Sequence, residues 1–129
     1  MFSNIKTSKA NKDIVTKLTS KLNLGAENLI ARIALTHSIS QERILQLEDI
    51  QDSGGKEYSF KVLFGDNAEY YIALICVHYN LYKSDKDIPR YIKMHIDDGL
   101  QLLDNDFTNT LGLDSLLGNI DRGLQYLAE

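Results

Sequence analysis

Hydrophobic residues in the first forty positions recur every three or four residues, which is the spacing of one buried helix face. A first helix is expected over residues 9–22, because Ser8 offers a capping hydroxyl just before an apolar stripe. Gly25 favours a helix end, and a second helix should cover residues 26–38. A short extended stretch around Ile5 precedes both helices. The chain is therefore expected to open with a strand followed by two helices.

The period of the pattern changes to two after a polar, glycine-rich loop at residues 49–55. Large apolar side chains then occupy every second position, which predicts a half-buried strand over residues 58–64. The alternating residues are Tyr58, Phe60, Val62 and Phe64. One strand cannot pair its own backbone groups, so it needs a partner. The candidates are residues 1–6 and the same strand of another copy of the chain.

Three further helices are expected in the rest of the chain. Residues 70–82 are apolar on all sides, which predicts a central helix covered on several faces, of a kind often found at a subunit interface. Pro89 suits the first turn of the next helix. A last helix is expected over residues 113–127. The apolar stripe of the helix at Pro89 is made by Ile88, Ile92, Ile96, Leu100 and Leu103. That of the last helix is made by Leu113, Leu116, Leu117, Ile120, Leu124 and Leu127.

These elements predict a mainly α protein with about five helices and one or two short strands. With 129 residues and 43% hydrophobic composition, the chain suits one domain, residues 1–129. Within it, residues 1–40 form a basic strand-helix-helix segment and residues 56–127 an apolar helical body. No stretch has the pattern of a membrane span or a signal peptide, so we expect a cytoplasmic protein with no membrane partner.

Charge is distributed unevenly along the chain. The net charge of −4 argues by itself against a nucleic-acid partner, yet residues 1–21 carry five lysines against Asp13 alone, a net +4 that leaves −8 for the remainder. The lysines are Lys6, Lys9, Lys12, Lys17 and Lys21. They form either a solvated face with no partner or a phosphate-binding patch. The second interpretation predicts salt-sensitive, largely sequence-independent DNA binding.

Candidate chemistry is sparse elsewhere. Cys76 is the only cysteine and stands in an apolar run, which favours a packed, inert thiol. The three histidines are isolated, so structural roles are expected, and His95 with Asp97 and Asp98 is the best acid-base candidate among weak ones. No nucleophile elbow or phosphate loop occurs. We therefore expect a protein that is not an enzyme and that has no metal site and no cofactor.

Several segments resemble the DndE family of DNA phosphorothioation proteins in order and spacing. The resemblance begins with Ile-Lys-Thr-Ser-Lys-Ala-Asn-Lys-Asp at residues 5–13 and Leu-Gly-Ala-Glu-Asn-Leu-Ile-Ala-Arg-Ile-Ala-Leu at residues 24–35. It continues through the alternating segment 58–64, Gly65 and the apolar helix to His95, Gly99 and Leu103. The strand-helix-helix start is also similar to that of ribbon-helix-helix proteins.

The resemblance implies a helical homotetramer that partners the other Dnd proteins. It also implies binding to DNA, with a preference for nicked duplex, through Lys9, Lys12, Lys17 and Lys21 and, less directly, Lys6. Cysteine desulfurase and iron-sulfur chemistry would come from the partners, since this chain lacks the cysteines for a cluster. The alternative is a protein-protein adaptor that scaffolds a modification complex through residues 70–82 and 113–127 without binding DNA.

Overall fold

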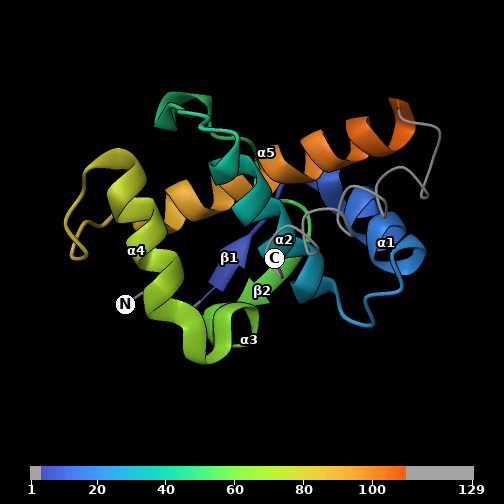
Figure 1. The fold of residues 1–129 in the computed structure, drawn as a ribbon, viewed down its shortest axis with the longest axis horizontal. Helices are drawn as coiled ribbons and strands as arrows, with labels where there is room; N and C mark the ends of the chain where they lie inside the picture. The colour runs from blue at the N-terminus through green and yellow to red at the C-terminus, as the bar shows by residue number, and fades with distance from the viewer. Residues whose placement is uncertain (1–3, 110–129) are drawn as a thin grey trace, which may run out of the picture.

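The computed structural model describes residues 4–109, which form a mainly helical protein with one small sheet (Figure 1). The elements are β1 (Asn4–Lys6), α1 (Lys12–Lys21), α2 (Glu27–Ser40), β2 (Glu57–Ser59), α3 (Phe60–Phe64), α4 (Ala68–Tyr79) and α5 (Ile88–Asn109). Short 3-10 turns cover Lys9–Asn11, Leu47–Asp49 and Gly65–Asn67. The expected strand-helix-helix start is confirmed, and so are the helices after Gly65 and at Pro89. The helix expected over residues 113–127 lies outside the described residues.

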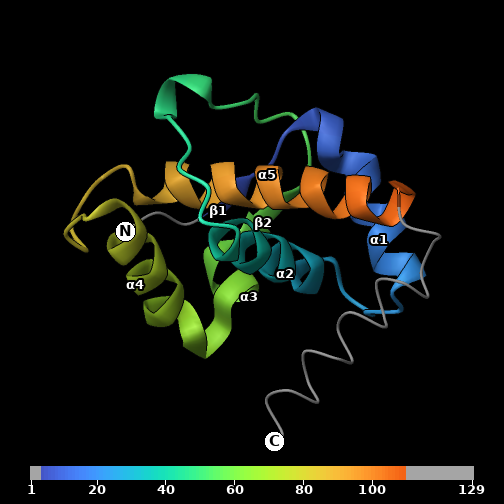
Figure 2. The same ribbon diagram turned by 45° about the horizontal axis from the view of Figure 1, so that its top comes forward.

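Helices α5 and α2 make the main packing contact of the fold. Figure 2 shows α5 running along the length of the molecule with α2 beside it. The expected apolar stripe of α5 is buried along its whole length, from Ile88 at 1% exposure to Leu103 at 5%. Gly99 permits a close backbone approach, because a Cβ at this position would lie 1.8 Å from the carbonyl oxygen of Ala34 in α2. Any side chain at residue 99 would push the two helices apart.

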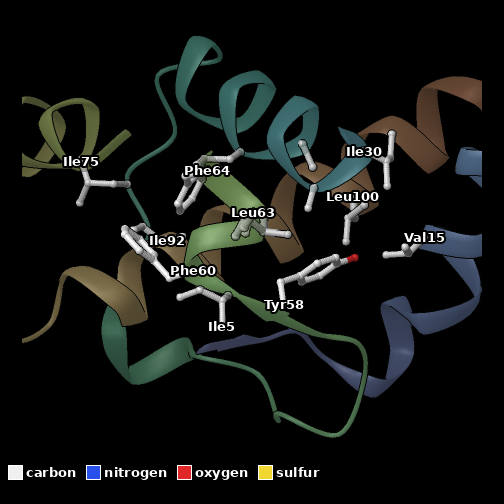
Figure 3. Close-up of a cluster of buried hydrophobic side chains, with 14 of the residues drawn as sticks. Ile5, Val15, Ile30, Tyr58, Phe60, Leu63, Phe64, Ile75, Ile92 and Leu100 are labelled. Atoms are coloured by element: carbon white, nitrogen blue, oxygen red, sulfur yellow. The ribbon is translucent and has the colours of Figure 1, made fainter. Parts of the chain in front are cut away.

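The small sheet joins the start of the chain to a segment near its middle. Strands β1 and β2 are antiparallel, with Ile5 opposite Tyr58. Of the two partners considered for the alternating segment, the N-terminal residues of the same chain are thus confirmed. Figure 3 shows both residues in the core, where the sheet meets α2, α3 and α5.

The strand predicted over residues 58–64 is wrong beyond Ser59. The Ser59 hydroxyl accepts a hydrogen bond from the Val62 backbone N–H at 3.1 Å and so caps α3. One helical turn then buries Phe60, Leu63 and Phe64 together and leaves Val62 63% exposed. The alternating pattern had predicted the opposite orientation for residues 62 and 63. The helical conformation is favoured over a strand because it directs three large side chains of the five-residue segment into the core.

Helix α4 was expected to be covered on several faces, as at a subunit interface, but the other elements of residues 4–109 cover only one side of it. Only Ile75 is fully buried, whereas Val77 is 83% exposed and Tyr70 is 60% exposed. One side of α4 packs through aromatic rings, with Tyr79 stacked on Tyr91 at 4.0 Å between centroids. Figure 1 shows α4 at one end of the molecule, where the described chain offers no second layer. Among these helices, none has the length and apolarity to cross a membrane.

Candidate nucleic-acid interface

Three of the five predicted lysines project freely from the N-terminal segment. Lys6 is the last residue of β1, Lys9 begins the 3-10 turn and Lys12 begins α1; all three side chains are exposed. Within residues 4–109, none of the three has a carboxylate within ion-pair distance. Their ammonium groups are therefore available to an anionic ligand.

The other two lysines face α5 instead. Lys17 forms an ion pair with Asp104, and the Lys21 ammonium lies 5.3 Å from the ring centroid of Phe107. These contacts fasten α1 to the C-terminal part of α5. The structure thus separates Lys17 and Lys21 from Lys6, Lys9 and Lys12.

An acidic residue of the loop before β2 fixes the backbone of the basic segment. The Asp52 carboxylate accepts hydrogen bonds from the backbone N–H of Lys9 at 3.0 Å and from the Ser8 hydroxyl at 2.9 Å. The backbone N–H of Gly54 adds a third at 3.0 Å. These donors, with the Lys9 backbone the strongest, lower the pKa of Asp52 to about 2, so the carboxylate is ionised at neutral pH.

A second, buried carboxylate holds the same segment from the side of α5. Asp97 Oδ1 accepts the backbone N–H of Ser8 at 2.9 Å and the side-chain amide of Asn11 at 2.7 Å. Its Oδ2 accepts the Lys93 ammonium at 2.5 Å. All four residues are almost fully buried. Asp97 thus sets the path of the chain between β1 and α1, and with it the spacing of Lys9 and Lys12.

A hollow of about 390 Å³ lies beside Lys6 and gathers basic groups from distant parts of the sequence. Arg90 and Lys93 of α5 line it together with Lys6. Arg90 pairs with Asp87 at 3.4 Å and buried Lys93 pairs with Asp97, so of the three only Lys6 has no ion-pair partner within residues 4–109. The remaining lining residues are Asn4, Ile5, Ile50, Gln51, Ser53 and Pro89. Gly54 is the next residue after Ser53 and lies against Lys9. A Cβ placed on Gly54 would be 3.4 Å from the Cβ of Lys9. Sequence reasoning missed Arg90 and Lys93, because nothing local connects them with β1.

His95, the best acid-base candidate, has both ring nitrogens occupied. Its Nδ1 lies 2.7 Å from the Ser38 hydroxyl and its Nε2 lies 2.6 Å from the Tyr79 hydroxyl. Ser38 donates its proton to Asp98 at 2.6 Å, so His95 Nδ1–H donates to Ser38 and Tyr79 donates to Nε2. Burial, and then the neighbouring His78, lower the pKa of His95 to about 4. This neutral ring joins α2, α4 and α5 and has no free nitrogen for a substrate.

Comparison with known proteins agrees with this architecture. Two crystal structures share the fold. One is DndE from Escherichia coli B7A, described as involved in DNA phosphorothioation modification, with a TM-score of 0.64 and 18% identity. The other is a glycine-to-lysine mutant of DndE, described as involved in DNA phosphorothioation, with a TM-score of 0.65 and 20% identity. Each match covers 80% of this chain and 98% of the solved chain. No curated protein sequence gives a match.

At these identities the structural likeness shows the fold alone, and the family assignment comes from the sequence. The profile described as "DNA sulphur modification protein DndE" matches residues 4–110, which is most of the 129-residue chain. The described elements from β1 to α5 lie within that match. The chain therefore belongs to the DndE family.

Proposed function

We propose that this chain is a non-catalytic DNA-binding component of a DNA phosphorothioation system. The observation that carries the proposal is the set of exposed lysines, Lys6, Lys9 and Lys12, none of which has a carboxylate at ion-pair distance within residues 4–109. Two carboxylates, Asp52 and Asp97, hold the backbone of this segment. The basic groups are thus displayed by a supported backbone and do not stand on a loose tail.

Lysines contact phosphates as point charges, so the surface is suited to the DNA backbone and not to base edges. Binding should therefore be salt-sensitive and nearly independent of sequence. A preference for nicked duplex fits a small basic surface, because a nick lets the duplex bend and brings more phosphates within reach. Lys17 and Lys21 contribute less in this scheme, since α5 already engages both side chains.

Other members of the system would supply the sulfur chemistry. The chain has one cysteine, Cys76, which cannot hold an iron-sulfur cluster within one copy. We propose that it acts with other Dnd proteins in the cytoplasm and as a homo-oligomer, with a tetramer as the expected form. Several copies would place several basic surfaces on one DNA molecule and raise avidity without new contacts.

A salt series tests the DNA surface. Binding of the full chain to intact, nicked and single-stranded DNA is measured by fluorescence anisotropy for the wild type and for Lys9→Ala/Lys12→Ala. The matched control is Lys61→Ala/Lys86→Ala, which removes the same charge from exposed positions outside the surface. Loss of two phosphate contacts should reduce the slope of log K against log salt by roughly two. The control should keep the wild-type slope.

A third variant examines the division among the lysines. Lys17→Ala/Lys21→Ala should leave the salt slope nearly unchanged, because both side chains contact α5. An equal loss of slope in this variant and in Lys9→Ala/Lys12→Ala would contradict the proposal that Lys9 and Lys12 contact phosphates while Lys17 and Lys21 do not. Absence of binding by the wild type even at low salt would reject the proposal. It would favour the adaptor, for which the exposed apolar residues of α4 are the supporting observation.

A further inference from the structure

The outward side of α4 has the shape of a helix-binding surface. Ala73 and Val77, one turn apart, form a ridge that borders two apolar grooves. The smaller groove, about 240 Å³, is completed by Ile39, Tyr70, Leu74 and His78. The larger, about 610 Å³, is completed by Glu69, Ile72, Cys76, Lys83 and Ser84. A ridge between two grooves is the surface that a second helix packs against, and residues 4–109 leave it uncovered.

The same chain has an apolar segment beyond the part that the family profile matches. The DndE profile ends at residue 110, and the matched crystal structures are covered to 98% while a fifth of this chain is left over. Residues 113–127 carry the stripe of leucines and Ile120 that predicts a helix. The exposed α4 grooves and a segment whose sequence predicts an apolar helix face thus occur in one chain.

Distance places the stripe on a different copy from the grooves that it would fill. Helix α4 contacts α5 at Tyr91 and His95, 14 or more residues before the end of α5 at Asn109, which is about 21 Å along the helix axis. The four steps of chain from Asn109 to residue 113 can span at most about 14 Å when fully extended. Figures 1 and 2 both show α4 and the last turn of α5 at opposite ends of the molecule. A helix that starts at residue 113 therefore cannot lay its whole stripe on α4 of its own chain.

We propose that residues 113–127 of one copy dock as a helix on the outward face of α4 of a second copy. The exchange is reciprocal, so two copies close around a twofold axis and each covers the other's α4 face. The pairing rests on apolar contact, because Glu69 and Lys83 both line the larger groove and their opposite charges offset each other. The proposal does not depend on DNA binding.

The single native cysteine gives a direct test, since Cys76 lines the larger groove. Wild-type chain is mixed with a Cys76→Ser/Gly123→Cys variant and oxidised under mild conditions. Gly123 borders the apolar stripe on a helical projection, so its replacement should approach Cys76 of the other copy. A covalent heterodimer on non-reducing gels is expected.

The control and the rival geometry use the same chemistry. Arg122 lies opposite the stripe, so the Cys76→Ser/Arg122→Cys variant should give little covalent dimer with the wild type. A chain carrying Cys76 and Gly123→Cys together reports docking within one copy, as a fast-migrating intrachain disulfide. Predominance of that product, or equal cross-linking from residues 122 and 123, would overturn the proposal.

A mass measurement provides the second readout. Val77→Asp places a charge on the ridge, whereas Val62→Asp makes the same change at a position that is 63% exposed on α3. Sedimentation should show a lower mass for Val77→Asp and the wild-type mass for Val62→Asp. A wild-type chain that is strictly monomeric would also overturn the proposal. DNA binding is assayed on the same samples, so its absence bears only on the function proposed above.

Discussion

Helices α4 and α5 invert the usual relation between apolar composition and burial. Helix α4 contains one charged side chain, Glu69, yet only Ile75 is fully buried. Helix α5 is rich in charged residues, yet it buries Lys93, His95 and Asp97 beside its apolar stripe. The more polar helix thus forms the centre of the molecule and the more apolar one lies at its edge.

The difference shows that partners, and not composition, decide burial here. Buried polar groups are tolerated when hydrogen bonds and opposite charges compensate for lost hydration. Asp97 has three such donors, and His95 has a hydroxyl on each ring nitrogen. The apolar surface of α4 has no comparable partner within residues 4–109. Its apolar character indicates a covering surface elsewhere, whereas that of α5 is satisfied inside the fold.

The largest predicted effect concerns the central position of α5. Gly99→Ala would place a Cβ 1.8 Å from the Ala34 carbonyl oxygen and force α2 and α5 apart. We expect a loss of more than about 3 kcal/mol in the free energy of unfolding, measured by urea denaturation. Asn105→Ala, on the exposed side of the same helix, should change it by about 0.5 kcal/mol or less. A fully stable Gly99→Ala protein would contradict the close packing.

A moderate effect should follow from pH. The pKa of His95 is lowered to about 4 in the folded protein, against 6.5 for an ordinary histidine, so the unfolded chain binds the extra proton between these values. Stability is therefore complete above pH 6.5 and falls as the pH drops toward 4. Between pH 7.5 and pH 5 the loss should be about 2 kcal/mol in urea titrations. His95→Gln should be less stable at pH 7.5 but should lose this part of the pH dependence; an unchanged dependence would exclude His95 as its source.

The smallest effect is expected on α4. Val77→Ser, at 83% exposure, should alter the free energy of unfolding by about 0.5 kcal/mol or less when copies are too dilute to associate. Ile96→Ala in α5, with no exposed surface, should cost about 2–5 kcal/mol in the same assay. Similar losses of unfolding free energy for Val77→Ser and Ile96→Ala would mean that α4 is covered within the single chain. The contrast between an exposed α4 and a buried α5 would then be wrong.

Local patterns predicted the helices well and the contacts between them poorly. The stripe of α5 was predictable because four-residue spacing identifies a helix face without knowledge of its partner. Phe60 and Phe64 were ambiguous, since a separation of four residues satisfies both a helix and a strand. Their helical form depends on the Ser59 cap and on the core that α2 and α5 provide.

The candidate interface was predictable only in part, because long-range contacts sort its charges. Asp104 of α5 pairs with Lys17 and leaves Lys12 exposed, although both lysines belong to α1. Arg90 reaches the hollow beside Lys6 only because α5 crosses next to β1. Such assignments need the tertiary arrangement, since no short-range pattern links these residues.

The link between Ser8 and Asp97 has a consequence for synthesis of the protein. The two residues are 89 positions apart, so the lysine-bearing segment leaves the ribosome long before the carboxylate that fixes its path. At about 5–20 residues per second, this interval lasts roughly 4 to 18 s. During that time the nascent chain exposes a polycationic N-terminus without its final shape. The protein therefore acquires its arranged basic surface only near the end of translation, when α5 has emerged and can close over the N-terminal segment.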